Sequence, residues 1–188
     1  MISETAYDEH VEQLFDVLAR VTGAFREAGI EYRLVGGLAI FLHVSERDPM
    51  AARLTRDIDM AVDRSDLFRI AEAVEPFGFK YRHTAGVDML VDARNPKARS
   101  AVHLLFVREK VRSQDPAAIP DFSPAVTARA GTLLAPVADL VRMKLISFRF
   151  KDKAHIKDMQ GVGLITPDIE ASLPEELRMR LAEVLAGE

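Results

Sequence analysis

The chain has 188 residues, of which 48% are hydrophobic and 29% charged, and its formal net charge is −4. This composition is typical of a folded globular protein, and it excludes an intrinsically disordered chain. The net negative charge argues against a protein that coats nucleic acid nonspecifically. Lys and Arg nevertheless gather over residues 94–112 and 142–158, where a polyanion could bind locally.

Three further observations concern location. No apolar run is long enough to cross a bilayer, so no membrane partner is expected. The acidic, amphipathic first fifteen residues are not typical of a secretion signal. There are no cysteines, which fits a reducing compartment. We therefore expect a cytoplasmic protein.

In the first half of the chain, helical and strand patterns alternate. They predict a helix over 8–30, a strand over 32–37, a helix over 37–46, a loop over 47–56, a strand over 57–62 and a helix over 65–79. Gly29 is suited to end the first helix, and Ser65 is suited to cap the start of the last one.

The second half predicts strands and then helices. We expect two or three strands over 80–107 with a turn at Asn95-Pro96, a proline-rich connection over 113–124, one helix from Pro136 to Gly161, and a short helix over 174–187. This order predicts an α/β (α+β) fold in which helices flank a mixed sheet. Residues 1–112 would form the core and 113–188 a helical region, or the two would form one compact domain.

Two carboxylates lie two residues apart in the apolar stretch "DIDMAV". Alternate residues of a strand share one face, so Asp57 and Asp59 should point the same way. Their mutual repulsion is relieved if water reaches both or if a cation binds between them. Mg²⁺ prefers such oxygen ligands and keeps positions open for substrate phosphates. A solvated strand end is the commoner explanation of an isolated Asp-x-Asp pattern.

A pair of glycines precedes the first short helix, in "LVGGLAIF". Gly36 and Gly37 would let a phosphate approach the backbone, and the helix start offers free N–H groups. A tight turn explains two glycines equally well when they occur alone. Their position before an Asp-x-Asp strand, with Thr55 just ahead of the aspartates, favours a phosphate site.

Together, "LVGGLAIFLH" and "LTRDIDMAV" resemble the signature of the nucleotidyltransferase superfamily, which shares the DNA polymerase β-like palm. With "MKLISFRFKDKAHIKDM", the sequence is similar to the AbiEii-type toxin branch. The resemblance implies a nucleotidyltransferase-like fold and Mg²⁺-dependent transfer of a nucleoside monophosphate from an NTP to a hydroxyl of tRNA or protein. It also implies an antitoxin partner of a type IV toxin–antitoxin system. An antibiotic-modifying nucleotidyltransferase and a catalytically degenerate nucleotide-binding module are the alternatives.

The resemblance also implies site residues. Metal binding would fall to Asp57 and Asp59, and nucleotide binding to Gly36, Gly37, Thr55, Lys144, Arg149, Lys151 and Asp158. The superfamily usually has a third carboxylate on a neighbouring strand. In "AVHLLFV" that position holds His103, whose ordinary pKa would let it accept a proton from an attacking hydroxyl. A buried histidine of the core is the simpler alternative, and Asp88 is a rival for the third carboxylate.

The basic helix predicted over Pro136–Gly161 has a charged side. On one continuous helix, Lys144, Lys151, His155 and Asp158 would share an arc of about 60°. Asp158 could then pair with either lysine. Asp152 falls on the apolar side and should reach a helix N-terminus or an arginine. The cations after the His103 strand either extend this basic surface or are solvated: Arg108, Lys110 and Arg112.

Overall fold

The computed structural model describes residues 4–94, 101–128 and 131–187. The strands are β1 (Tyr32–Val35), β2 (Ile58–Val62), β3 (Phe79–Thr84), β4 (Val87–Asp92), β5 (Val102–Phe106), β6 (Val126–Thr127) and β7 (Leu133–Leu134). The α-helices are α1 (Glu4–Glu27), α2 (Gly36–Arg47), α3 (Leu67–Val74), α4 (Val137–Ser147), α5 (Phe150–Gly161), α6 (Pro167–Ser172) and α7 (Glu175–Ala186). Short 3₁₀ turns cover Arg64–Asp66 and Glu75–Phe77.

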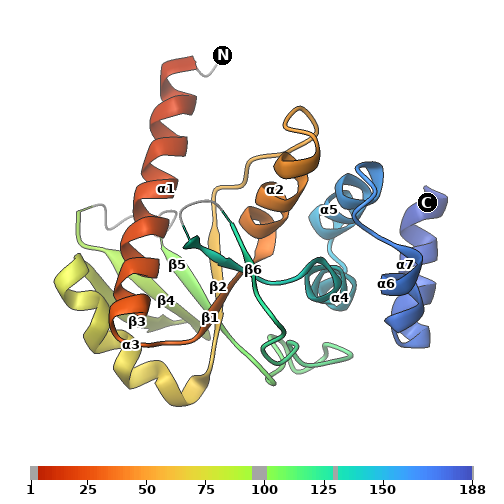
Figure 1. Ribbon diagram of the computed structural model, residues 1–188. Coiled ribbons are helices and arrows are strands. Elements are labelled where there is room, and N and C mark those ends of the chain that lie inside the picture. The colour runs from red at the N-terminus through yellow and green to blue at the C-terminus, as the bar shows by residue number, and fades with distance from the viewer. Residues whose placement is uncertain (1–3, 95–100, 129–130, 188) are drawn as a thin grey trace.

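The strands form one mixed sheet in the order β3-β4-β5-β2-β1-β7-β6, with helices around it (Figure 1). This confirms the predicted fold class. β1 pairs with β2 in antiparallel fashion, and β2 pairs with β5 in parallel. The second pairing places Asp59 directly beside His103. Two positions 44 residues apart in the sequence therefore meet in the middle of the sheet.

The two faces of the sheet have different coverings. On one face, α1 packs with Phe25 edge-on to Tyr32 of β1, at 5.5 Å between ring centroids, and with Arg20 over Phe79 of β3. The other face carries Arg33, whose guanidinium donates to the Ser123 carbonyl at 3.0 Å and 2.8 Å. The connection after β5 therefore crosses this second face on its way to α4. Side-chain alternation puts Asp59 on this face as well.

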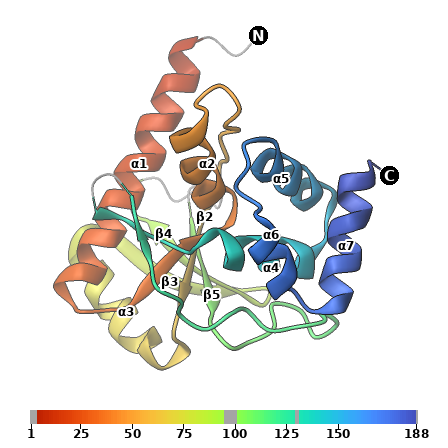
Figure 2. The same cartoon turned by 45° about the vertical axis from the view of Figure 1, so that its right-hand side comes forward.

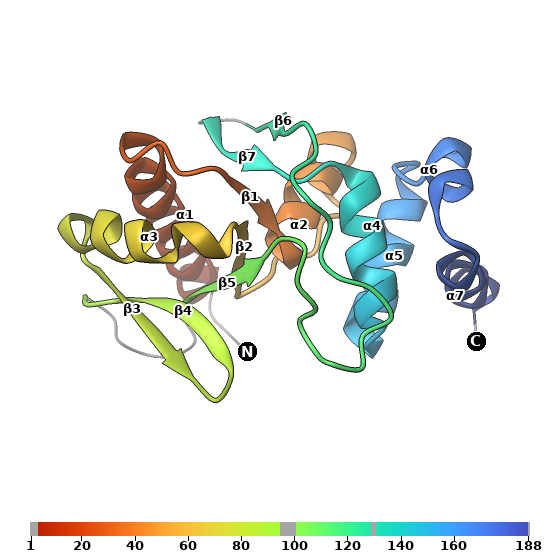
Figure 3. The same ribbon diagram turned by 90° about the horizontal axis from the view of Figure 1, so that it is seen from below.

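The C-terminal helices α4 to α7 stand to one side of the sheet, and α4 and α5 pack on α2 (Figures 2 and 3). The prediction of one continuous helix from Pro136 to Gly161 was wrong. Phe148 has a left-handed backbone with φ of 48°, which ends α4, and α5 begins after Arg149. The Asp152 carboxylate accepts the Arg149 backbone N–H at 3.1 Å, which satisfies a free donor at the new helix start.

Other local predictions also needed correction. Ser65 is not an N-cap, since the carboxylate of Asp63 accepts its backbone N–H and caps the turn that leads into α3. The two-residue strands β6 and β7 and the short helix α6 were not predicted. The turn predicted at Asn95-Pro96 lies outside the described residues. Within those residues, none of the helices has the length and apolar character needed to span a bilayer.

Candidate active site

Asp59 is the centre of the candidate site. Its carboxylate Oδ1 lies 3.1 Å from Nδ1 of His103 on the neighbouring strand. Its other oxygen faces Gly36, where a Cβ atom would fall 2.0 Å from Oδ2 of Asp59. Gly36 also has a φ of 72°, a conformation that side chains other than glycine's adopt at a cost. Both observations explain why glycine begins α2 at this point.

The sequence left open whether His103 or Asp88 lies beside the aspartate pair, and the structure has His103 next to Asp59. The hydrogen bond to Asp59 raises the pKa of His103, burial opposes this effect, and the charge of Asp57 adds to it. Both carboxylates therefore act on one imidazole. Asp57 itself lies just before β2 rather than inside it, and its backbone N–H faces Thr55 Oγ1 at 3.5 Å.

Asp88, the rival candidate, is excluded by the sheet. It pairs in register with Leu104, one residue along β5 from His103, and so lies on the opposite face. There its carboxylate accepts the Tyr81 hydroxyl at 2.6 Å and contacts His83 Nδ1 at 3.0 Å. His103, and not Asp88, lies beside Asp59.

The start of α2 is enclosed by two further side chains. A Cβ atom at Gly37 would lie 2.9 Å from Thr55 Oγ1 and 3.4 Å from Cε1 of His155 in α5. Gly37 therefore leaves room for the loop before β2 and for α5 to approach the helix start together. Burial, together with the charge of Lys144, lowers the pKa of His155 to about 4. The ring is therefore neutral at neutral pH.

Asp152 organises the two cations on either side of the helix break. It is fully buried, accepts Lys144 Nζ at 3.0 Å, and accepts Arg149 Nε at 2.8 Å. Burial alone would raise its pKa, but the hydrogen bond from Arg149 and the charge of Lys144 hold the pKa of Asp152 well below its ordinary value. The expectation that Asp152 reaches an arginine and a helix start is confirmed.

The helical-arc prediction for Lys144 was wrong, because it assumed one continuous helix. Lys144 is buried and paired with Asp152, while Lys151 is exposed. Asp158 pairs with neither lysine; its Oδ1 lies 3.1 Å from Nε of Arg53, in the loop before β2. Arg53 gave no signal in the sequence, because its loop has no periodic pattern that would place it against α5.

The basic residues after β5 also separate. Arg108 pairs with Asp63 and with Asp121 at the surface, the latter at 2.5 Å, and Lys110 is exposed. Arg112 alone borders the candidate site. The expected extension of a basic surface is therefore limited to Arg112.

A cavity of about 310 Å³ opens beside Asp59 and His103. Its wall comes from Gly36, from Val87 at the start of β4, from β5, from the connection after β5 and from α4. Gly37, Thr55 and Lys151 do not line it. Asp59, His103 and Gly36 all line this cavity, so it adjoins the start of α2. No sequence pattern predicts the cavity, because its wall is assembled from apolar residues that are distant along the chain.

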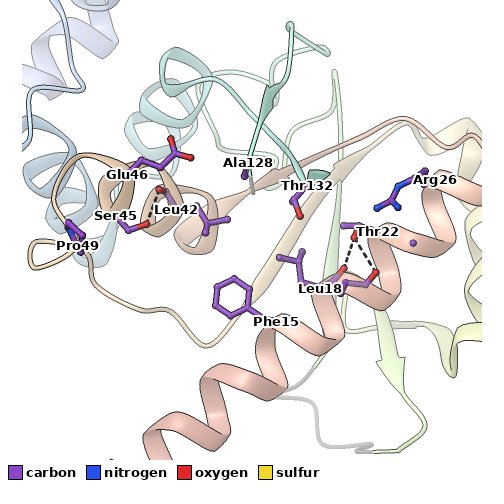
Figure 4. A pocket seen from close by; sticks show the side chains of 12 residues that line it. Phe15, Leu18, Thr22, Arg26, Leu42, Ser45, Glu46, Pro49, Ala128 and Thr132 are labelled. Carbon is purple, nitrogen blue, oxygen red and sulfur yellow. Dashed lines mark hydrogen bonds between the residues drawn. The ribbon is translucent and has the colours of Figure 1, made fainter. Parts of the chain in front are cut away.

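A second, larger cavity of about 1160 Å³ lies between α1 and α2 (Figure 4). Phe15, Leu18, Thr22 and Arg26 of α1 line one side of it, and the end of α2 and the β7 region line the other. None of the predicted site residues contributes to its wall. The larger hollow is therefore separate from the candidate site.

The donor set can be compared with the needs of a divalent metal. Within the described parts of the chain, no group of three or more His, Asp and Glu side chains has metal-binding geometry. Asp57 and Asp59 offer two carboxylates, and the absence of a side chain at Gly36 lets Asp59 lie against the start of α2. Mg²⁺ is bound in many enzymes by one or two carboxylates plus substrate phosphates and water. The residues present therefore fit Mg²⁺ bound together with a nucleotide.

Comparisons with known proteins support the fold. No protein-family model matches the chain, and no curated protein is detectably similar to it. The antibiotic-resistance factor ANT(2'')-Ia has a similar structure. Its crystal structure in complex with adenylyl-2''-tobramycin has a TM-score of 0.54 and 14% identity, covering 93% of this chain and 98% of that one. Its solution structure has a TM-score of 0.50 and 10% identity, covering 94% and 84%. The chain thus shares the fold of an antibiotic nucleotidyltransferase.

Proposed function

We propose that this protein is a Mg²⁺-dependent nucleotidyltransferase that moves a nucleoside monophosphate from an NTP to a hydroxyl group. One observation carries the proposal: the Asp59 carboxylate lies between the glycine start of α2 and His103. The carboxylate of Asp59 would thus have the phosphate-binding start of α2 on one side and the proton acceptor His103 on the other. The fold shared with ANT(2'')-Ia supports the same class of reaction.

The phosphates would bind at the start of α2. Among the described residues, no side chain caps the start of α2, so its free N–H groups and the positive end of the helix dipole would favour an anion. Asp57 and Asp59 would hold Mg²⁺. When bound, Mg²⁺ would neutralise phosphate charge and polarise the attacking hydroxyl. Thr55 would support this cradle through its contact with Gly37.

His103 would receive the proton. With Nδ1 held by Asp59, the ring presents Nε2 to an incoming hydroxyl. The acceptor oxygen attacks the α-phosphorus and forms a new P–O bond. The bond between that phosphorus and the bridging oxygen breaks, pyrophosphate leaves, and the hydroxyl proton passes to Nε2 of His103.

The charged residues of α4 and α5 would have different roles. Lys151 is exposed, and its charge lowers the pKa of the His103 imidazole, which supports a role in contacting phosphate. Lys144 is buried against Asp152, and we propose that it positions Asp152 and Arg149 rather than contacting triphosphate itself. Asp158 would act through Arg53 by holding the loop that carries Thr55.

The direct test is pyrophosphate release from a mixture of the four NTPs with Mg²⁺ and pooled hydroxyl acceptors. Wild type should release pyrophosphate, and Asp57→Asn and Asp59→Asn should each reduce the rate about 100-fold or more, since metal-clamped charge stabilisation is lost. Asp48→Asn, an exposed carboxylate in the same loop, is the matched control and should be unaffected. Equal rates of pyrophosphate release in wild type and both site variants would refute the proposed enzymatic activity.

A degenerate nucleotide-binding module is the second candidate, and His103 in place of a carboxylate favours it. Calorimetry would then show Mg²⁺-dependent NTP binding while pyrophosphate release stays at the level of Asp59→Asn. The AbiEii-type toxin role, a tRNA or protein acceptor, an antitoxin partner and a cytoplasmic location stay predictions from the sequence. A winged-helix antitoxin that copurifies with the chain would support the toxin role.

A further inference from the structure

The cavity beside Asp59 and His103 has a mostly apolar wall. Eight apolar side chains line it: Val87, Leu105, Val111, Ala117, Ile119, Leu140, Met143 and Ile146. Of the proposed phosphate cradle only Gly36 borders this space, while Gly37 and Thr55 lie outside it, so most of the cavity is left for the other substrate. We propose that the acceptor is an uncharged, hydroxyl-bearing small molecule with an apolar body. This inference rests on the proposed nucleotidyl transfer.

The charges on the wall argue against a polycationic acceptor. Two carboxylates border the cavity, Asp59 and Asp115. Asp59 is assigned to Mg²⁺, and the buried Asp115 accepts the backbone N–H of Arg112 at 3.0 Å. Three cations also border the cavity: Arg112, Lys144 and Arg149. Asp152 pairs with both Lys144 and Arg149, so carboxylates and cations nearly balance around the cavity. A molecule with several ammonium groups would therefore find no surplus of negative charge on this wall.

Two apolar residues of the wall reach the protein surface. Val87, at the start of β4, is 41% exposed, and Val111, in the connection after β5, is 58% exposed. Both line the cavity beside the exposed Arg112, so the solvent-facing part of its wall is partly apolar. The volume of about 310 Å³ is at the lower end of small-molecule pockets. A cavity of this size fits one compact acceptor molecule whose hydroxyl would point to Asp59 and His103.

The reaction fits this placement. The hydroxyl of the cavity-bound acceptor forms the bond to the α-phosphorus, pyrophosphate leaves from the α2 side, and the proton moves to His103 at the cavity's inner end. Apolar contacts would supply most of the acceptor's binding energy, at about 25 cal/mol per Å² of buried apolar surface. Changing one wall residue should therefore alter acceptor affinity.

The experiment compares two hydroxyl acceptors of different charge. The probes are 4-nitrophenyl β-D-glucoside, which is neutral with an apolar ring, and tobramycin, which is polycationic. Transfer from α-labelled NTP is measured with each probe and with pooled tRNA, for wild type, Met143→Glu and Met179→Glu. Met143 lines the cavity, whereas Met179 is 63% exposed on α7 and serves as the matched control.

We expect wild type to label the glucoside with a kcat/KM about tenfold or more above that for tobramycin. Met143→Glu should raise the KM for the glucoside about tenfold, since a carboxylate replaces an apolar wall. Met179→Glu should match wild type. Preferred labelling of tobramycin or of tRNA would overturn the inference and leave nucleotidyl transfer standing.

Calorimetric titration of the protein with the glucoside, without NTP, tests the assignment of the cavity separately from nucleotidyl transfer. If no acceptor is labelled, nucleotidyl transfer fails. The cavity assignment is still supported if wild type and Met179→Glu bind the glucoside while Met143→Glu binds it about tenfold more weakly. Absence of binding to wild type, or equal binding by all three proteins, overturns the assignment.

Discussion

A Cβ atom added at Gly36 would lie 2.0 Å from Oδ2 of Asp59, so the start of α2 and the carboxylate of β2 fit together only because residue 36 has no side chain. Gly36→Ala must displace the Asp59 carboxylate or the helix start. We expect pyrophosphate release to fall about 100-fold, since a displacement near 1 Å in an active site has costs of that order. Steady-state kinetics with saturating NTP and Mg²⁺ measures this.

Gly29→Ala is the control for this prediction. Gly29 also has a left-handed backbone, with φ of 61°, but open space surrounds the position where a Cβ would be. Both alanine variants should lose about 1–2 kcal/mol of stability from backbone strain. Only Gly36→Ala should lose activity. Equal activity in the two variants would show that the closeness to Asp59 does not matter for catalysis.

Asp152→Asn should strongly destabilise the protein. The substitution leaves Lys144 buried without its counter-charge, and loss of one partner of a buried ion pair costs about 3–5 kcal/mol. Urea unfolding followed by circular dichroism measures the change in the free energy of unfolding. Glu183→Gln, which breaks the more exposed pair with Lys153, should cost less than about 1 kcal/mol.

The double variant Lys144→Met with Asp152→Asn extends this prediction. Removing the buried cation as well should recover part of the lost stability, because no unpaired charge then stays inside. If the double variant is no more stable than Asp152→Asn alone, the Lys144 charge is not the source of the destabilisation.

His155 should make stability depend on pH in mildly acidic solution. Its folded pKa of about 4 lies below the ordinary value of 6.5, so the unfolded chain binds the proton more tightly. The stabilisation from the neutral ring is therefore complete above about pH 6.5 and falls as the pH drops toward 4. A shift of this size corresponds to about 3 kcal/mol at most.

The check is the free energy of unfolding of wild type and His155→Gln, measured between pH 4 and 7. Because glutamine does not titrate in this range, the difference between the two proteins isolates His155. The wild-type curve should be steeper between pH 4 and 6.5. Parallel curves would contradict the low pKa of the buried ring.

The ion pair between Arg53 and Asp158 should restrain the loop between α2 and β2. Asp158 is 10% exposed, and its other oxygen is buried with no hydrogen-bond partner among the described residues. Arg53→Met should therefore speed amide hydrogen exchange over residues 49–57. Arg47→Met, a change of the same type at the end of α2, is the control. Unchanged exchange in Arg53→Met would mean that packing alone holds the loop.

Much of the site could be predicted because its signals are local. The glycines before α2 and the Asp-x-Asp at β2 follow from strand and helix patterns a few residues long. The family resemblance pointed to His103 in "AVHLLFV" with Asp88 as a rival, and only the parallel pairing of β2 with β5 shows that His103 lies beside Asp59. Asp152 was predicted to have a polar partner because it is a charged residue on the apolar side of its helix.

The parts of the fold and site that were not predicted depend on features that a short sequence pattern does not encode. The helix break at Phe148 comes from one left-handed residue inside a run with good helical periodicity, so the arc drawn through Lys144 and Asp158 was misleading. The Arg53 contact and the cavity wall join segments that meet only in the folded chain. The two-residue strands β6 and β7 are too short to show an alternation.

The side-by-side pairing of Asp59 with His103 also limits how this region can evolve. Inserting or deleting one residue in β5 ahead of His103 would bring valine or leucine to the place beside Asp59 and turn the imidazole toward the α1 side. Changes in chain length should therefore be excluded from β5 and confined to its flanking loops. Homologues that keep the Asp-x-Asp pair but shift β5 by one residue should have lost the proposed nucleotidyltransferase activity while keeping the fold.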